Sequence, residues 1–144
     1  MTTDNLQTLS AQYGHSGCLM CGQKDPLLLA LRFFPVGDNA VRTEFRPRSL
    51  VQGYDGIVHG GIVAALLDSA MTNCMFHKGI KAVTGDLHVR YKKQIPIDTF
   101  LELKAQIMLI KPPLYYLRAE ISQGDCLFAR AEAKFMRCPP RQLI

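Results

Sequence analysis

The longest apolar segment of the chain follows a glycine-rich turn and predicts a buried helix. The residues from Gly56 onward are Gly-Ile-Val-His-Gly-Gly, and a mainly apolar stretch continues from there to about Phe76. A helix that is apolar on all sides is normally buried. Lys78 and Gly79 follow the stretch, and a glycine after a basic residue is a common end of a helix.

Alternating apolar and polar positions on both sides of this segment predict antiparallel strands. We expect strands over about residues 27–34, 40–45, 87–91, 101–109, 117–121 and 127–135. Turns are expected at 35–39 and 123–125. Every second residue from Leu101 to Leu109 is expected to lie on one face of its strand, and three alanines at 129, 131 and 133 would allow a helix to approach closely. The pattern predicts an α+β domain in which a sheet of about five or six strands wraps one helix.

The length of 144 residues suits one domain. Residues 1–26 are expected to form an N-terminal extension, with a short helix over 3–12 followed by a loop. The main domain is expected over 27–138, and 139–144 form a C-terminal tail.

Composition and charge exclude several classes of function. The chain is 48% hydrophobic and 20% charged, and no window approaches the ~18 apolar residues of a membrane span. The polar opening of the sequence is not a signal peptide. The net charge of +5 fits either a solvated surface or an anionic ligand, and no recognition helix or aromatic-basic motif indicates nucleic acid. We expect a cytoplasmic protein with no membrane span and no nucleic-acid partner.

The five cysteines are predicted to be reduced. Cys74 and Cys126 lie in predicted core elements and resemble small hydrophobic residues. Cys18 and Cys21, with His15 three residues earlier, form half of a zinc-site pattern, but no second Cys-x-x-Cys pair follows. The sequence favours a tight turn with packed thiols, and no metal ligands are expected.

Asp68 is the only formal charge between Ile57 and Phe76. An ionised carboxylate in apolar surroundings is costly unless it is paired or reached by water, and perturbed carboxylates concentrate at reactive sites. The alternative is a structural carboxylate satisfied by backbone donors or an arginine.

The start of the predicted helix offers a second reactive group. Its first turn has unpaired N–H groups and a partial positive charge, which can hold a carbonyl oxygen as it becomes an oxyanion. Gly61 and Asp68 are seven residues apart, or ~10 Å along a helix. A two-fold dimer that places one helix start beside the partner's helix would resolve this distance.

On these residues the chain resembles the hotdog-fold acyl-CoA thioesterases, in the branch that includes phenylacetyl-CoA-type enzymes. The shared pattern covers roughly residues 27–137 and comprises Gly56-Ile57-Val58-His59-Gly60-Gly61, Leu66-Leu67-Asp68, Thr84, Val89-Arg90-Tyr91 and Pro96. The resemblance implies a hotdog fold, a homodimer joined edge to edge with active sites at the subunit interface, and an acyl-CoA substrate without a cofactor. Pairing of dimers into a tetramer stays open.

The resemblance also assigns roles to individual residues. It implies that the Gly60 N–H is an oxyanion donor and that Asp68 of the other subunit is the general base or the nucleophile. Thr84 is implied to help hold the attacking water, which requires a bulge at Gly85 because strict alternation would put Thr84 on the same face as Asp86. Gln52 stands beside the position where some relatives have asparagine, and it is a candidate to hold the acyl carbonyl or the water.

The remaining candidate site residues are expected to contact the substrate. Val58, His59 and Gly61 are at the helix entrance, where His59 is expected to cap and shape the turn. Arg90, Lys92 and Lys93 form a basic segment suited to the phosphates of coenzyme A, with a solvated strand end as the alternative. A thiol leaves readily as the thiolate, since its pKa is near ~8.5, so a thioesterase needs no strong general acid.

Two other functions on the same fold stay open. A non-catalytic acyl-CoA-binding module is compatible with the fold, since fold alone does not fix function, although Asp68 argues against it. An acyl-thioester hydratase or dehydratase is less favoured, because the chain lacks the His-Phe-Pro-Gly stretch and the Asp-x-x-x-x-His spacing of those relatives.

Overall fold

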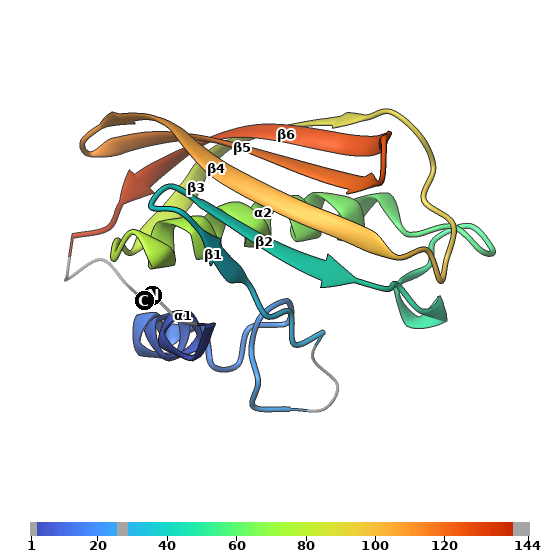
Figure 1. Cartoon of the computed structure of the whole chain (residues 1–144), viewed down its shortest axis with the longest axis horizontal. Coiled ribbons are helices and arrows are strands. Elements are labelled where there is room, and N and C mark those ends of the chain that lie inside the picture. The colour runs from blue at the N-terminus through green and yellow to red at the C-terminus, as the bar shows by residue number, and fades with distance from the viewer. Residues whose placement is uncertain (1–2, 26–28, 140–144) are drawn as a thin grey trace.

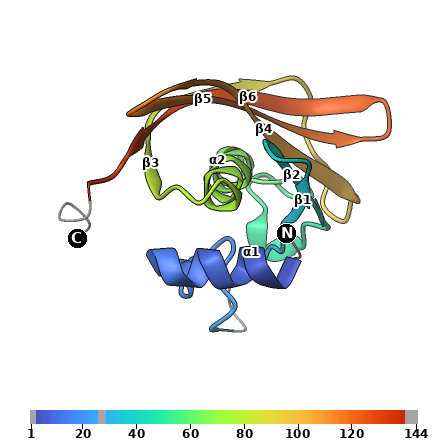
Figure 2. The same cartoon turned by 60° about the vertical axis from the view of Figure 1, so that its left-hand side comes forward.

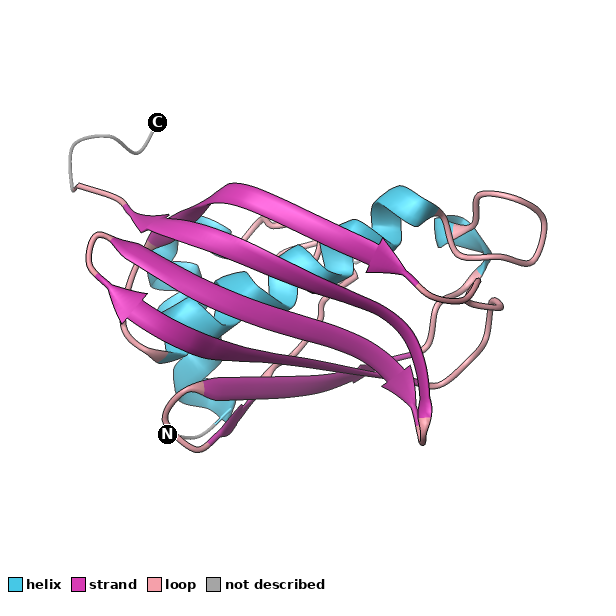
Figure 3. Cartoon of the chain, turned by 90° about the horizontal axis from the view of Figure 1, so that it is seen from above, coloured by secondary structure: helices cyan, strands magenta, loops and turns pink. Residues whose placement is uncertain are grey.

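A long helix, α2 (Gly60–His77), lies in the concave face of a six-stranded antiparallel sheet (Figures 1 and 3). The computed structural model describes residues 3–25 and 29–139. Viewed nearly along α2, the sheet curls around this helix, and α1 (Thr3–Ser10) lies on the opposite side of it (Figure 2). The predicted α+β architecture is confirmed.

The sheet has the spatial order β1-β2-β4-β5-β6-β3. Its strands are β1 (Phe34–Val36), β2 (Ala40–Phe45), β3 (Ala82–Tyr91), β4 (Leu101–Lys111), β5 (Leu114–Gln123) and β6 (Cys126–Arg137). The chain leaves α2 and enters β3, which forms one edge of the sheet. β3 pairs with β6, and no other strand of the described residues pairs with its outer side. A ten-residue strand with a free edge is a natural place for another chain to add.

The core forms between α2 and the inner face of the sheet. Leu66, Leu67, Met71 and Met75 of the helix have no solvent-exposed area. The three predicted alanines of β6 lie on the inner face and are at most 5% exposed, so the helix packs close to this strand. Among the described residues, no helix is both long and apolar enough to cross a membrane.

Enlarging one of these alanines is expected to destabilise the fold. Ala131→Leu adds three carbon atoms at a site that is 1% exposed, and overpacking of this kind costs about 1–3 kcal/mol. Urea denaturation measures the change in the free energy of unfolding. Glu132→Leu is the matched control because Glu132 is exposed on the outer face, and an equal loss of stability in both variants would contradict this packing.

The prediction of a strand over 27–34 is wrong for most of this range. Leu27 and Leu28 fall outside the described residues, and strand pairing begins only at Phe34. The N–H groups of Leu29 and Leu31 donate to carbonyls of residues 19 and 20 in the N-terminal extension, 2.9 and 2.8 Å away. Because these backbone groups bind the extension, they do not join the sheet. β1 instead continues through Val36, so the turn is shorter than predicted.

A bulge in β4 overturns a second expectation. The register with β5 shifts between Ile107 and Leu109, so the alternation that begins at Leu101 does not continue to the end of the strand. Leu109 is 46% exposed, so it does not share the buried face of Leu101 and Leu103 as predicted.

Candidate active site

The structure brings Asp68 and Thr84 together in the space between α2 and β3. The Thr84 hydroxyl donates a hydrogen bond to Oδ1 of Asp68, with 2.5 Å between the two oxygens. A bulge between Thr84 and Asp86 makes this contact possible, as the sequence predicts. Thr84 pairs with the buried Phe135 on the inner face, whereas Asp86 is exposed. Both members of the pair are only partly buried.

His59 caps the first turn of α2. Its Nδ1 accepts a hydrogen bond from the Gly61 N–H at 2.8 Å, and its carbonyl accepts from Ile62 and Val63, both at 3.0 Å. These bonds satisfy the N–H groups of three helix residues. Among the described residues, none accepts from the N–H of Gly60, which is exposed. The helix start therefore presents one free backbone donor at its positive end.

Tyr91 fixes the helix start against the end of β3. Its hydroxyl donates to the carbonyl of Gly60 at 2.8 Å. Tyr91 is part of the Val89-Arg90-Tyr91 pattern, but the sequence analysis predicted no contact for its side chain. The alternation of β3, which places Tyr91 on the same face as Val89, is the sequence signal that could have indicated this contact.

A cavity of about 340 Å³ opens beside the first turn of α2. It is lined by Tyr54, Ile57, Val58, Gly60, Val63, Tyr91, Lys92, Lys93, Gln94 and Ile95. Four of the predicted residues, Val58, Gly60, Lys92 and Lys93, thus meet at one place. Lys92 and Lys93 are held there because their backbone N–H groups both donate to the Phe128 carbonyl, at 2.8 and 3.0 Å. Tyr54 is 83% exposed at the rim and was missed by the sequence analysis.

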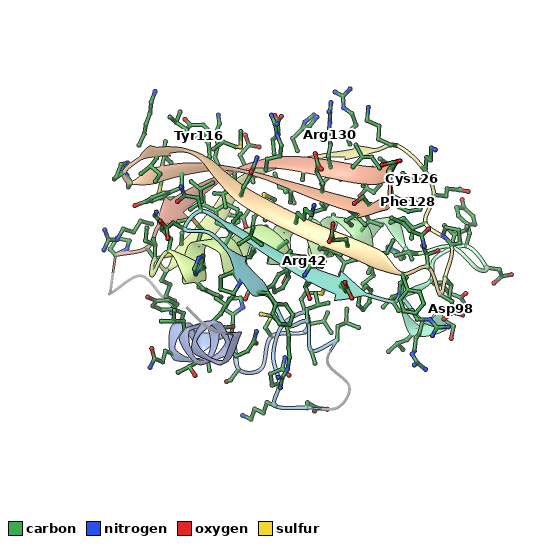
Figure 4. The ribbon with its side chains drawn as sticks, viewed as in Figure 1. Arg42, Asp98, Tyr116, Cys126, Phe128 and Arg130 are labelled. Atoms are coloured by element: carbon green, nitrogen blue, oxygen red, sulfur yellow. The ribbon has the colours of Figure 1, made fainter. Side chains whose placement is uncertain are left out.

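Neither the Gln52 nor the Arg90 side chain joins this group, although the backbone of Gln52 is bridged to that of Val58. The Gln52 side chain accepts a hydrogen bond from the Gly56 N–H at 3.1 Å and so stabilises the turn before the helix. Arg90 is paired in register with Arg130, whose side chain points away from α2 on the outer face of the sheet (Figure 4). Neither residue lines the cavity at the helix start.

His15 of the N-terminal extension lies near the Asp68 carboxylate. Its pKa is lowered, first by burial and then by the positive charge of Lys81, while the negative charge of Asp68 acts in the opposite direction. Its ring packs edge-on against Phe76, with 4.9 Å between the ring centroids. The sequence indicated only a loop here. The extension in fact covers the side of α2 that the sheet leaves open (Figure 2).

Gly60 and Asp68 are well separated within one chain. Asp68 is eight positions after Gly60 in α2, which is about 12 Å at 1.5 Å per residue. A single carbonyl group is too small to contact both groups of the same molecule. The geometry therefore contains two half-sites, a carboxylate with its hydroxyl partner and a backbone donor with its cavity.

A family model matches the central part of the chain. Residues 55–127 match the family model of the thioesterase superfamily, and this segment covers more than half of the 144 residues. The chain belongs to the thioesterase superfamily. The match includes the helix start, Asp68 and Thr84. The phenylacetyl-CoA branch is not singled out and stays a prediction.

One similar relative of this superfamily member is the mouse acyl-coenzyme A thioesterase THEM4. The two sequences are 30% identical over 94 residues, which is 64% of this chain and 40% of the mouse protein. The chain thus spans less than half of the length of that relative.

Solved thioesterase structures show the same fold. Zebrafish thioesterase superfamily member 2 matches 96% of this chain and 99% of its own, with a TM-score of 0.77 and 14% identity. A hypothetical thioesterase from Streptococcus pneumoniae, solved with coenzyme A, matches 78% of this chain and 88% of its own, with a TM-score of 0.71 and 18% identity. In two further structures of that protein, an aspartate and a threonine are each replaced by alanine.

Proposed function

We propose that this protein hydrolyses an acyl-CoA thioester to a free acid and coenzyme A. The observation that carries the proposal is the hydrogen bond from Thr84 to Asp68 on the central helix of a thioesterase-superfamily fold. The name of the mouse relative and the coenzyme A in the Streptococcus structure support the choice of substrate class.

The chemistry follows from the two half-sites. Thr84 donates to Oδ1 of Asp68, which leaves Oδ2 to accept a proton from water while the water oxygen attacks the carbonyl carbon. The carbonyl oxygen becomes an oxyanion, to which the Gly60 N–H donates. The C–S bond then breaks, the electron pair leaves with sulfur, and the thiolate takes up the proton. In the alternative route, Asp68 attacks the carbon, the thiolate leaves, and water hydrolyses the mixed anhydride.

The active site is proposed to form between two copies of the chain. The free edge of β3 allows two sheets to join. In such a dimer, Gly60 of one protomer and Asp68 of its partner would act on the same substrate carbonyl. The support for a shared site is the separation of about 12 Å within one chain, which no single substrate carbonyl can bridge. Pairing of such dimers into a tetramer stays open.

Coenzyme A is proposed to enter through the cavity at the helix start. Lys92 and Lys93 are exposed at that cavity, and their charge attracts phosphates. Val58 and the aromatic ring of Tyr54 offer apolar contacts at the same opening. Arg90 is on the outer face, so its role toward phosphates requires a substrate that extends around the edge of the sheet. We also expect a cytoplasmic location, in keeping with five cysteines that are all free thiols.

Removing the Thr84 hydroxyl is expected to slow hydrolysis without unfolding the protein. Thr84→Val keeps the shape but deletes a hydrogen bond to a charged group, which is worth about 1.5–3 kcal/mol. We expect kcat to fall about 10- to 100-fold, with a smaller change in KM. Thr84→Ser restores a hydroxyl and is expected to recover most of the rate. Equal losses in both variants would show that the methyl group, and not the hydroxyl, matters.

The direct test of the function is a panel of acyl-CoA substrates, from short aliphatic through phenylacetyl to long-chain thioesters. The decrease of thioester absorbance follows the reaction without a thiol reagent, which the cysteines of the chain would consume. We expect saturable turnover of at least one class of substrate. Tight binding of acyl-CoA with no cleavage of any of them would overturn the proposal in favour of a binding module.

A further inference from the structure

The N-terminal extension brings three metal-ligating side chains together on the open side of α2. One nitrogen of His15 and the sulfurs of Cys18 and Cys21 all lie within 4.8 Å of one another. They come from one short segment, in which Gly14 has a φ of +92° and turns the chain between the end of α1 and the cysteines. We propose that His15, Cys18 and Cys21 bind a zinc ion that fastens the extension to the central helix.

The spacing of the donor atoms fits zinc. The distance from Cys21 Sγ to His15 Nδ1 is 3.5 Å. In a tetrahedral site with Zn–S near ~2.3 Å and Zn–N near ~2.1 Å, neighbouring sulfur and nitrogen ligands lie about 3.6 Å apart. Two thiolates and an imidazole are also ligands that zinc prefers over harder cations.

The backbone of the cysteine turn fixes Cys18 and its sulfur. The Met20 N–H donates to Cys18 Sγ at 3.4 Å, and the Gly22 N–H donates to the Cys18 carbonyl at 2.8 Å. A side chain at position 22 would approach backbone atoms of Cys18 and Ser16 to 2.6 Å, so only glycine fits there. Backbone N–H groups directed at sulfur stabilise a thiolate and orient it toward a metal.

A second observation on the helix side points to the same place. Asn73 of α2 has no exposed area and lies within hydrogen-bonding reach of the Cys21 thiol. Its Nδ2 donates to the Ser69 carbonyl at 2.9 Å, whereas its Oδ1 has no partner among the described residues. A buried amide oxygen without a partner is costly, and a water in the fourth zinc position would satisfy it by donating a hydrogen bond.

The ion would act as a structural clip. A cavity of about 390 Å³, lined in part by His15, Cys21 and Gln7, leads to the cluster and gives the ion an entry path. His15 packs on Phe76 of α2, so the bound metal would fix the extension along the side of the helix that carries Asp68. Binding energy at such a site adds directly to folding stability.

The test is elemental analysis of the full-length, tag-free protein expressed with zinc in the medium. We expect about one zinc per chain, and X-ray absorption of the wild type is expected to show two sulfur ligands and at least one nitrogen. Cys18→Ser and Cys21→Ser are each expected to lower the zinc content at least tenfold. Cys126→Ser is the matched control, since it removes a partly buried thiol outside the cluster and is expected to leave the zinc content unchanged.

Three results would overturn the proposal. These are a Cys18–Cys21 disulfide in the purified protein, failure of the wild type to take up zinc against a competing chelator, or full zinc content in both serine variants. Absorption spectroscopy of the wild type does not depend on whether the variants fold. None of these measurements uses thioester hydrolysis, so failure of the zinc site and failure of the proposed function are distinguishable.

Discussion

Asp68→Asn is expected to lower kcat/KM for acyl-CoA hydrolysis by at least about 100-fold, because an amide neither accepts a proton from water nor attacks a carbonyl. The variant keeps the size of the side chain, and its amide oxygen still accepts the hydrogen bond from the Thr84 hydroxyl. We therefore expect the fold and the assembly state to be retained. Steady-state kinetics together with size-exclusion chromatography checks both expectations.

The matched control for this variant is Asp86→Asn. Asp86 is two residues from Thr84 on the same strand, but it is exposed on the outer face, 4.0 Å from the Lys134 ammonium group. We expect its activity to stay within about twofold of the wild type, because an exposed ion pair contributes little. A wild-type rate in Asp68→Asn would rule out both catalytic routes through this carboxylate.

Gly60→Pro is expected to cost about 10²- to 10³-fold in kcat, which is the usual effect of removing one oxyanion donor. Gly60 is the first residue of α2, and proline is tolerated at this position because its fixed φ suits a helix and no N–H is needed there. His59 has a φ of −58° and a ψ of +133°, which a residue before proline readily adopts. The substitution therefore deletes a single donor with little change in the fold.

Gly60→Ala separates the loss of this donor from steric effects. Its added carbon would lie 3.8 Å from the nearest atom of the Tyr91 ring, an ordinary contact, and its N–H stays in place. We expect the alanine variant to keep most of the activity that the proline variant loses. If both variants lose activity equally, crowding of the cavity explains the loss and the oxyanion role is wrong.

The sequence predicts the central helix and most of the sheet because their signals are local and strong. The apolar run after Gly61 and the alternation of the later strands each outweigh the secondary-structure preferences of single residues. The bulge at Gly85 was predictable because the expected role of Thr84 required its side chain on the inner face.

Other features depend on contacts between distant segments, which one sequence does not display. The segment around Leu29 has strand-like composition, but its N–H groups bind the extension instead of a neighbouring strand. The Gln52 side chain accepts a hydrogen bond from Gly56 in the turn before α2, and the sequence does not indicate this contact. The sequence favoured packed thiols over a metal at Cys18 and Cys21 because no second Cys-x-x-Cys pair follows, whereas the closeness of the His15 nitrogen to both sulfurs appears only in the folded chain.

The most direct test of the central claim mixes two inactive variants. Asp68→Asn and Gly60→Pro are unfolded together, refolded and assayed beside each variant refolded alone. If each site takes Gly60 from one protomer and Asp68 from its partner, a mixed dimer has one intact site, and random pairing restores about a quarter of the wild-type activity. Activity no higher than the mean of the two separate variants, with mixed dimers present by native mass spectrometry, would contradict an active site shared between subunits.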